Sequence, residues 1–228
     1  MLLATSVLVL LAAPEIEKLG PVPAATARVF LVRHGQAFSN LDPEPKLPPV
    51  KLDSLTDLGH AQARAVAAAL KGQDVSGVLS SPAGRARGTA EDIRDALKAN
   101  LVVIEPSLRP LDLGRAPDGK PLDWDQRIAE WSAGRDPTPP GGESLERVGA
   151  RVLELVMMQR RRGQALVFVS HGEVIGSFLG LLQGTPAPKR YPPKVHNGSI
   201  TVIDVSEGKP PKVLLSDFVP AAANSSKP

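Results

Sequence analysis

Residues 28–35 read RVFLVRHG, in which a run of apolar and β-branched residues ends at an arginine, a histidine and a glycine. A short continuous apolar run closed by a glycine-containing turn is typical of a strand buried on both faces of a parallel sheet. Residues 165–172, ALVFVSHG, have the same arrangement. The sequence therefore predicts two buried strands that each end at a histidine.

Strands and helices alternate along the rest of the chain. Four further strands are predicted at 74–81, 101–105, 199–205 and 212–218. Helices are predicted over 56–70, 82–97, 124–131, 144–162 and 172–182, with Thr56 and Ser144 as N-caps. This alternation predicts an α/β fold: a single domain with a mostly parallel sheet and helices on both faces.

The composition is that of a soluble globular protein, with 228 residues of which 42% are hydrophobic and 22% charged. We place one domain at 28–218, interpret the Pro- and Gly-rich stretch 106–142 as a specificity insertion, and expect a disordered tail at 219–228. The absence of cysteine excludes disulfides, thiol nucleophiles and thiolate metal sites. A net charge of only +3 without a basic arm argues against nucleic acid as a partner. Nothing in the sequence predicts an oligomeric state.

The N-terminal segment 1–27 begins with a 12-residue uncharged apolar run, LLATSVLVLLAA at 2–13. A membrane-spanning helix needs about 20 such residues, so we expect no stable membrane insertion of the mature domain. The length fits the apolar part of a secretory signal, and the small residues at 25–27 resemble a cleavage site. We expect export to a periplasm or medium, although no Lys or Arg precedes the run. The alternative is a cytoplasmic protein with an extra buried element or a misassigned start codon.

The predicted strand ends bring together two histidines and two arginines, namely Arg33, His34, Arg85 and His171. In sheets of this kind ligands bind at the carboxyl ends of the strands. Guanidinium groups match phosphate oxygens, and a neutral imidazole can attack phosphorus to form a phosphohistidine. We therefore predict a phosphoryl site that needs no metal and no cofactor. Gly35 and Gly172 would let the backbone approach the anion, and the helix after His171 would present its N-terminus to it.

Five blocks of the chain resemble the histidine phosphatase (phosphoglycerate mutase-like) superfamily, branch one. They are LVRHGQAFSN (31–40, with the RHG motif), LTDLGHAQA (55–63), SSPAGRARGTA (80–90), PGGESLERV (140–148) and VSHGEVI (169–175). The resemblance implies a three-layer α/β fold and a phosphorylated nucleophile at His34. It also implies that Arg33, Arg85 and His171 complete the phosphate pocket and that Asn40 contacts the phosphate.

One block departs from the family pattern. Members of branch one carry a glutamate as general acid where the stretch 108–114, LRPLDLG, has Pro110. Two carboxylates are candidates to replace it. Asp112 would lie on the same side as residue 110 if the segment were extended. Glu173 follows His171 in the first turn of a helix, and we prefer it because a carboxyl group beside a phosphate dianion is favoured in its protonated form.

The sequence thus predicts a metal-independent hydrolase of small-molecule phosphate monoesters. The alternatives are a phosphoglycerate mutase-type phosphotransferase and a non-catalytic phospholigand-binding module that has lost its acid. Glu143 is either a helix N-terminal acid or a pocket residue, and Trp124 and Trp131 are expected to pack. The substrate is not predicted, although four arginines of the insertion suggest an anionic group beyond the phosphate unless they are merely solvated: Arg109, Arg115, Arg127 and Arg135.

Overall fold

The computed structural model describes residues 16–159, 163–191, 193 and 195–220. The predicted signal segment at 2–13 lies outside the described residues, as do residues 160–162 and most of the predicted tail. Within the described part of the chain, no helix is long and apolar enough to cross a membrane.

The centre of the molecule is one sheet of six strands in the order β3-β2-β4-β1-β5-β6. Strands β1 to β4 pair in parallel, whereas β5 pairs antiparallel with β1 and β6 antiparallel with β5. This confirms the predicted α/β fold with a mostly parallel sheet. The strands are β1 (Thr26–Arg33), β2 (Val75–Ser80), β3 (Val102–Ile104), β4 (Ala165–Ser170), β5 (Ile200–Ser206) and β6 (Lys212–Phe218).

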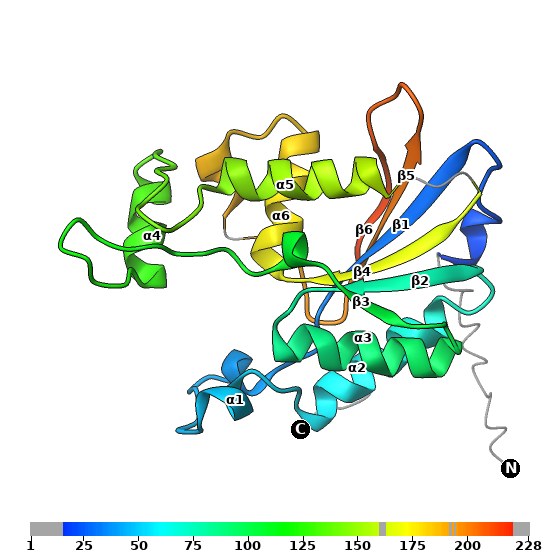
Figure 1. Ribbon diagram of the computed structural model, residues 1–228, viewed down its shortest axis with the longest axis horizontal. Coiled ribbons are helices and arrows are strands. Elements are labelled where there is room, and N and C mark those ends of the chain that lie inside the picture. Colours follow the sequence, from blue (N-terminus) through cyan, green and yellow to red (C-terminus); the bar gives the residue numbers. More distant parts are fainter. Residues whose placement is uncertain (1–15, 160–162, 192, 194, 221–228) are drawn as a thin grey trace, which may run out of the picture.

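Helices cover both faces of this sheet, as Figure 1 shows. One face packs against α2 (Asp57–Ala69) and α3 (Gly84–Leu97), and the other packs against α5 (Leu145–Met158) and α6 (Gly172–Leu182). Side chains along β1 alternate between the two cores: Val29 and Leu31 lie on the α5–α6 side, and Phe30 lies on the α2–α3 side. The continuous apolar run of β1 follows from burial on both faces.

Two of the helices begin where the sequence predicts. The hydroxyl of Thr56 accepts the backbone N–H of Gly59 at 3.1 Å, and the hydroxyl of Ser144 accepts that of Arg147 at 3.2 Å. Each hydroxyl satisfies a backbone donor that has no partner inside its own helix. The helix after Ser144 ends at Met158 and not near residue 162, so the prediction was too long at its C-terminal end.

Two segments outside the sheet and its four covering helices lie beyond the carboxyl ends of the parallel strands. Short helix α1 (Pro49–Leu52) belongs to the connection between β1 and α2, and α4 (Trp124–Ser132) belongs to the predicted insertion. At the other end of the domain, Ile16 is fully buried in the α2–α3 core. The packed part of the chain therefore includes residues ahead of position 28.

Candidate active site

Strand register brings the two histidines to one edge of the sheet. Arg33 at the end of β1 pairs with Ser170 at the end of β4, and the next residues are His34 and His171. The backbone N–H of His34 continues this pairing by donating to the carbonyl of Ser170 at 2.9 Å. The two imidazole rings are buried and their centroids are 5.1 Å apart. The convergence predicted from the strand ends is confirmed in the fold.

Hydrogen bonds define the tautomer of His34. Its Nδ1 lies 2.8 Å from the carbonyl oxygen of Gly35, which can only accept, so Nδ1 carries the proton. Its Nε2 accepts the Nε–H of Arg85 at 3.1 Å. Burial, and then the charge of Arg85, lower the pKa of His34 to about 3. At neutral pH the ring is therefore uncharged, with its lone pair on Nε2 directed toward Arg85.

His171 has the opposite tautomer. Its Nδ1 accepts from a terminal nitrogen of Arg85 at 3.2 Å, so the proton is on Nε2, which donates to the hydroxyl of Ser81 at 2.8 Å. Burial and then the neighbouring His34 and Arg85 hold the pKa of His171 well below its usual range. A single guanidinium thus contacts both imidazoles and fixes their relative position.

Arg85 is itself held by a carboxylate that the sequence reasoning missed. The Asp53 carboxylate forms an ion pair with Nη1 of Arg85, and its other oxygen accepts the backbone N–H of Gly84 at 2.6 Å. Asp53 lies between α1 and α2 and belongs to none of the recognisable blocks. The one available signal was indirect: a guanidinium held in one orientation needs hydrogen-bond acceptors, and a carboxylate is one group that can supply them.

Arg33 approaches the same space from β1. One of its terminal nitrogens donates to the carbonyl of Val195 at 2.6 Å, whereas its Nε is buried and has no hydrogen-bond partner among the described residues. Gly172 lies against this guanidinium, and a β-carbon at position 172 would come within 3.3 Å of that Nε. Arg33 Nε is therefore a donor that an anion could satisfy.

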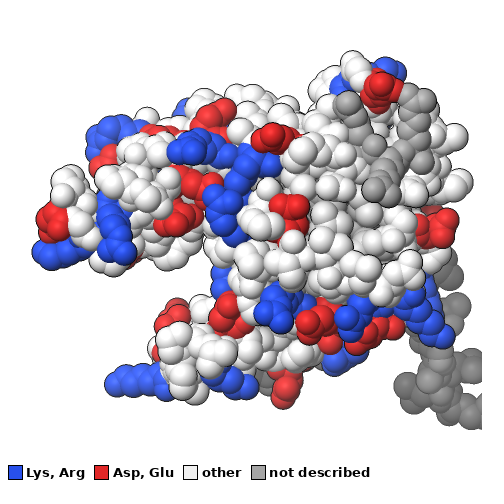
Figure 2. Space-filling view, in the orientation of Figure 1, with Lys and Arg blue, Asp and Glu red and all other residues white. Residues whose placement is uncertain are grey.

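A cavity of about 650 Å³ opens above these groups. Figure 2 shows the corresponding cleft between the part of the molecule that carries α4 and the part that carries α1. Besides His34, its lining includes six of the residues predicted to bind phosphate or catalyse the reaction: Arg33, Asn40, Arg85, His171, Gly172 and Glu173. Gly35 is not among the lining residues. Its N–H donates to the Thr89 hydroxyl at 3.0 Å, and its lack of a side chain allows close contact with the backbone of Gly59.

The two candidate acids lie in different places. Glu173 lines the cavity, and its Oε1 accepts the backbone N–H of Leu111 at 3.3 Å, beside Pro110. Asp112 is exposed, and its Oδ1 instead accepts the backbone N–H of Gly114 at 3.0 Å. Asp112 lines another cavity together with Pro110, and it is not among the residues that line the cavity of the histidines.

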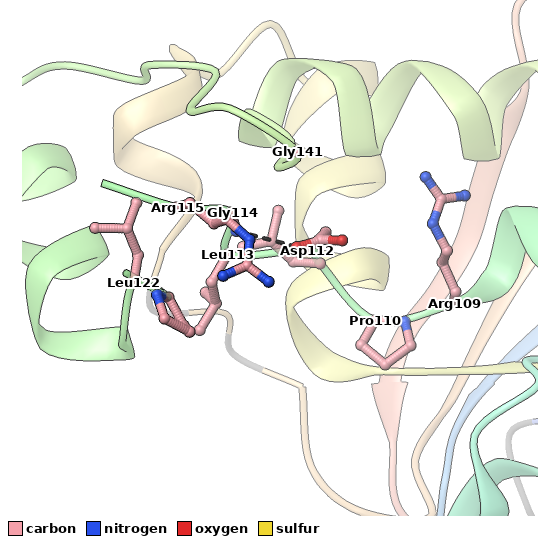
Figure 3. A pocket seen from close by; sticks show the side chains of 10 residues that line it. Arg109, Pro110, Asp112, Leu113, Gly114, Arg115, Leu122 and Gly141 are labelled. Atoms are coloured by element: carbon pink, nitrogen blue, oxygen red, sulfur yellow. Dashed lines mark hydrogen bonds between the residues drawn. The ribbon is translucent and has the colours of Figure 1, made fainter. Parts of the chain in front are cut away.

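A second cavity, of about 640 Å³, is the one that Asp112 lines. Figure 3 shows Asp112 bonded to Gly114, with Arg109 and Arg115 also on the wall. The ten residues that line it include neither histidine. Pro110, Leu111 and Leu113 line both cavities, so this segment forms the partition between them.

Glu143 belongs to the support of that partition and does not line the histidine cavity. Its carboxylate pairs with Arg109 at 2.8 Å and with Arg151 at 2.9 Å. Arg151, which the sequence analysis did not consider, also donates to the carbonyls of Arg109 at 2.9 Å and Pro110 at 3.3 Å. The largely buried Arg151 thereby fixes the backbone on which Leu111 meets Glu173.

A family comparison agrees with this geometry. The family model described as "Histidine phosphatase superfamily (branch 1)" matches residues 29–217. The chain belongs to this family. Among curated proteins, "Probable phosphoglycerate mutase GpmB" of Yersinia pestis is 29% identical over 190 residues, which cover 79% of this chain and 86% of the relative.

Solved histidine phosphatase folds superpose on most of the chain. YhfR of Bacillus stearothermophilus has a TM-score of 0.68 at 24% identity, covering 86% of this chain and 99% of its own, and supports the fold alone. A mycobacterial glucosyl-3-phosphoglycerate phosphatase solved with VO3 has a TM-score of 0.62 at 26% identity, covering 84% and 99%. This member of the histidine phosphatase superfamily therefore resembles both a phosphatase and a protein named as a mutase.

Proposed function

We propose that this histidine phosphatase is a metal-independent phosphomonoester hydrolase that works through a phosphohistidine on His34. The observation that carries the proposal is the state of His34, a neutral buried imidazole whose Nε2 lone pair has only the Arg85 N–H as its partner. A phosphate oxygen that takes over this N–H would release the lone pair for attack on phosphorus. His171, Arg33 and Arg85 would then stabilise the negative charge of the transferring group.

In the first step, the lone pair on Nε2 of His34 forms a bond to phosphorus while the bond from phosphorus to the ester oxygen breaks. The departing oxygen takes the proton of the Glu173 carboxyl group and leaves as the alcohol. The His34 Nδ1–H stays bonded to the Gly35 carbonyl, which keeps Nε2 facing the phosphorus. In-line displacement of this kind needs positioning and charge stabilisation more than covalent help from the protein.

In the second step, a water molecule attacks the phosphorus of the phosphohistidine. The proton of that water passes to an oxygen of the transferring phosphoryl group, and the bond between Nε2 and phosphorus breaks with its electron pair returning to Nε2. Inorganic phosphate leaves and the Glu173 carboxylate regains its proton from solvent, so both His34 and Glu173 are restored. The support for Glu173 is its place on the cavity wall beside Pro110, where the resemblance puts the acid of the family.

A second candidate function is favoured by Pro110, which has no proton to give. A protein with this pocket and no working acid would bind phosphate esters without cleaving them. The experiment that separates the two is a rapid-quench incubation with a radiolabelled phosphate monoester. Acid-labile, alkali-stable label on the protein, lost in His34→Ala together with turnover, supports the hydrolase.

The metal-independent part of the proposal has its own test. No group of three or more His, Asp or Glu side chains within the described residues is arranged to hold a metal ion. Turnover should therefore survive prolonged dialysis against a chelator. Activity that disappears with the chelator and returns with a divalent cation would overturn this part, and full activity in His34→Ala would overturn the covalent mechanism.

A further inference from the structure

Three aromatic side chains are packed together above the histidines. The indole of Trp124 stacks on the ring of Tyr191, with centroids 5.6 Å apart and planes inclined by 19°. The ring of Tyr191 in turn packs against that of Trp131, with centroids 4.8 Å apart. Trp131 is buried, and its indole N–H donates to Asp136 at 3.0 Å. The Trp124–Tyr191–Trp131 cluster is therefore tied to the body of the protein at its inner end.

Trp124 is the outer member of this cluster and remains 38% exposed. Both Trp124 and Tyr191 line the cavity that contains His34. The expectation that both tryptophans pack is thus right for Trp131 and incomplete for Trp124. Ligand pockets are lined predominantly by apolar and aromatic side chains, and Trp124 and Tyr191 give this cavity such a wall.

The rest of the wall near Trp124 is also apolar. Pro110, Leu111, Leu113 and Pro193 complete this side of the cavity. Burial and the nearby Glu173 carboxylate raise the pKa of Tyr191, so its phenol stays neutral and adds no charge. The wall therefore suits an apolar ring and offers no ionic partner to it.

Among the described residues that line the cavity, Arg33 and Arg85 are the only arginine or lysine side chains, and Glu44 and Glu173 are acidic. None of the four arginines of the insertion lines this cavity. Arg109 pairs with Glu143, and Arg135 pairs with Glu130. Arg115 and Arg127 donate to backbone carbonyls. A carboxylate or second phosphate on the alcohol would face no counter-charge from these residues.

We propose that the ligand of this site is a phosphate monoester whose alcohol carries an uncharged aromatic ring, and that this ring packs against Trp124. The assignment rests on the proposed function, since it names the alcohol of the ester that His34 would cleave. The affinity of the site for such a ring can nevertheless be measured without turnover. Aromatic rings packed on one another gain affinity from apolar burial and from the stacking geometry together.

The test uses two phosphonates, in which a carbon–phosphorus bond prevents cleavage. Isothermal titration with 2-(1-naphthyl)ethylphosphonate and with ethylphosphonate gives the ratio of their dissociation constants. We expect the naphthyl compound to bind at least about tenfold more tightly, equivalent to about 1.4 kcal/mol. In Trp124→Ala the two dissociation constants should differ by no more than about twofold, whereas Trp124→Phe should retain most of the preference for the naphthyl compound.

Met158→Ala is the matched control, because Met158 is 63% exposed and lies at the end of α5, away from the cavity lining. It should keep the wild-type ratio. Equal affinities in the wild type, a preference that survives in Trp124→Ala, or tighter binding of 3-phosphoglycerate than of the naphthyl compound would overturn the assignment. A strong preference for the naphthyl compound without any turnover would support the assignment of the aromatic ring and would contradict only the proposed hydrolase activity.

Discussion

The Glu173 carboxylate accepts the backbone N–H of Leu111 at 3.3 Å. Leu111 immediately follows Pro110, so a carboxylate from the start of α6 lies beside the residue that holds the place of the family's glutamate in the resemblance. Arg151 fixes the backbone on one side of this contact and α6 fixes Glu173 on the other. A carboxylate from another element thus lies next to the proline that stands where the family pattern has a glutamate.

This relationship predicts that Glu173→Gln impairs only substrates that need a proton. Alkoxides, with conjugate-acid pKa values of roughly 15, should be cleaved about a hundredfold more slowly, because they cannot leave unprotonated. Nitrophenolate, at about 7, leaves without help, so p-nitrophenyl phosphate should be hydrolysed nearly as before. Steady-state kinetics on the two classes measure the difference.

Asp112→Asn is the matched control for this experiment, because the Asp112 carboxylate lines the other cavity. It should affect both substrate classes little. Selective loss on alkyl phosphates in Asp112→Asn, or equal loss on both classes in Glu173→Gln, would assign the proton to another group.

The contact of Arg85 with both histidines predicts a large effect of Arg85→Lys. Lysine keeps the charge and cannot reach Asp53 and both imidazoles with one planar group. The turnover number should fall at least about tenfold, or about 1.4 kcal/mol in the barrier. Asp53→Asn should also lower turnover by loosening Arg85, so we assign Asp53 as a positioning residue.

A double-mutant cycle distinguishes positioning from an independent role. If Asp53 acts through Arg85, the two substitutions together should cost little more than Arg85→Lys alone. Strictly multiplicative losses would mean that Asp53 affects turnover by a different route. A raised Michaelis constant with unchanged turnover would place Arg85 in ground-state binding only.

The two buried imidazoles predict a specific dependence of stability on pH. Folding lowers the pKa of His34 from about 6.5 to about 3, so between these values the unfolded chain binds more protons than the folded one. The free energy of unfolding therefore begins to fall as the pH drops below about 6.5, by roughly 1.4 kcal/mol per pH unit for each such group. Above about pH 6.5 His34 is neutral in both states and no longer changes the free energy of unfolding with pH.

The comparison with His34→Gln isolates the effect from the carboxylates, which titrate in both proteins. Urea unfolding at several values between about pH 4 and pH 6 should show a shallower loss of unfolding free energy in His34→Gln than in the wild type, by close to the slope of one group. Identical slopes would mean that His34 does not gain a proton on unfolding.

We propose, further, that the chain is exported and that processing occurs ahead of Ile16. Cleavage after residues 25–27 would remove Ile16 from the core, and it would cut within β1, where Ala27 is buried. It would also detach Gly20, whose carbonyl accepts from Arg28 at 2.9 Å. Intact-mass measurement on protein from its native host should give an N-terminus between residues 14 and 16.

Two results would contradict this proposal in different ways. Protein that retains Met1 in a cytoplasmic fraction would defeat export. A mature N-terminus at Arg28 would leave export intact and would contradict only the position argued from the packing of Ile16.

The sheet and the convergence of the histidines could be predicted because their causes are local in the sequence. The apolar runs before His34 and His171 require burial on both faces, and hydroxyl side chains at Thr56 and Ser144 mark helix starts. Parallel pairing then leaves no freedom in where the strand ends lie. The same reasoning does not depend on which residues fill the loops.

The supporting contacts could not be predicted because they join segments far apart in the chain. Asp53 reaches Arg85 and Arg151 reaches Pro110 across unrelated connections. The place of the Asp112 carboxylate likewise depends on a contact that alternation along a strand does not predict, since it accepts the N–H of Gly114, whose φ is 75°.

The partition formed by Pro110, Leu111 and Leu113 has a consequence for engineering. The groups proposed to break the ester sit at strand ends and in the first turns of α3 and α6, whereas the apolar wall comes from the insertion and from Tyr191 and Pro193. Grafting residues 112–135 from a relative should therefore exchange the preferred alcohol while leaving the phosphate chemistry in place. The graft must begin after Leu111. Arg151 holds the carbonyls of Arg109 and Pro110, and Glu173 accepts the N–H of Leu111, so the backbone up to Leu111 supports the reacting groups.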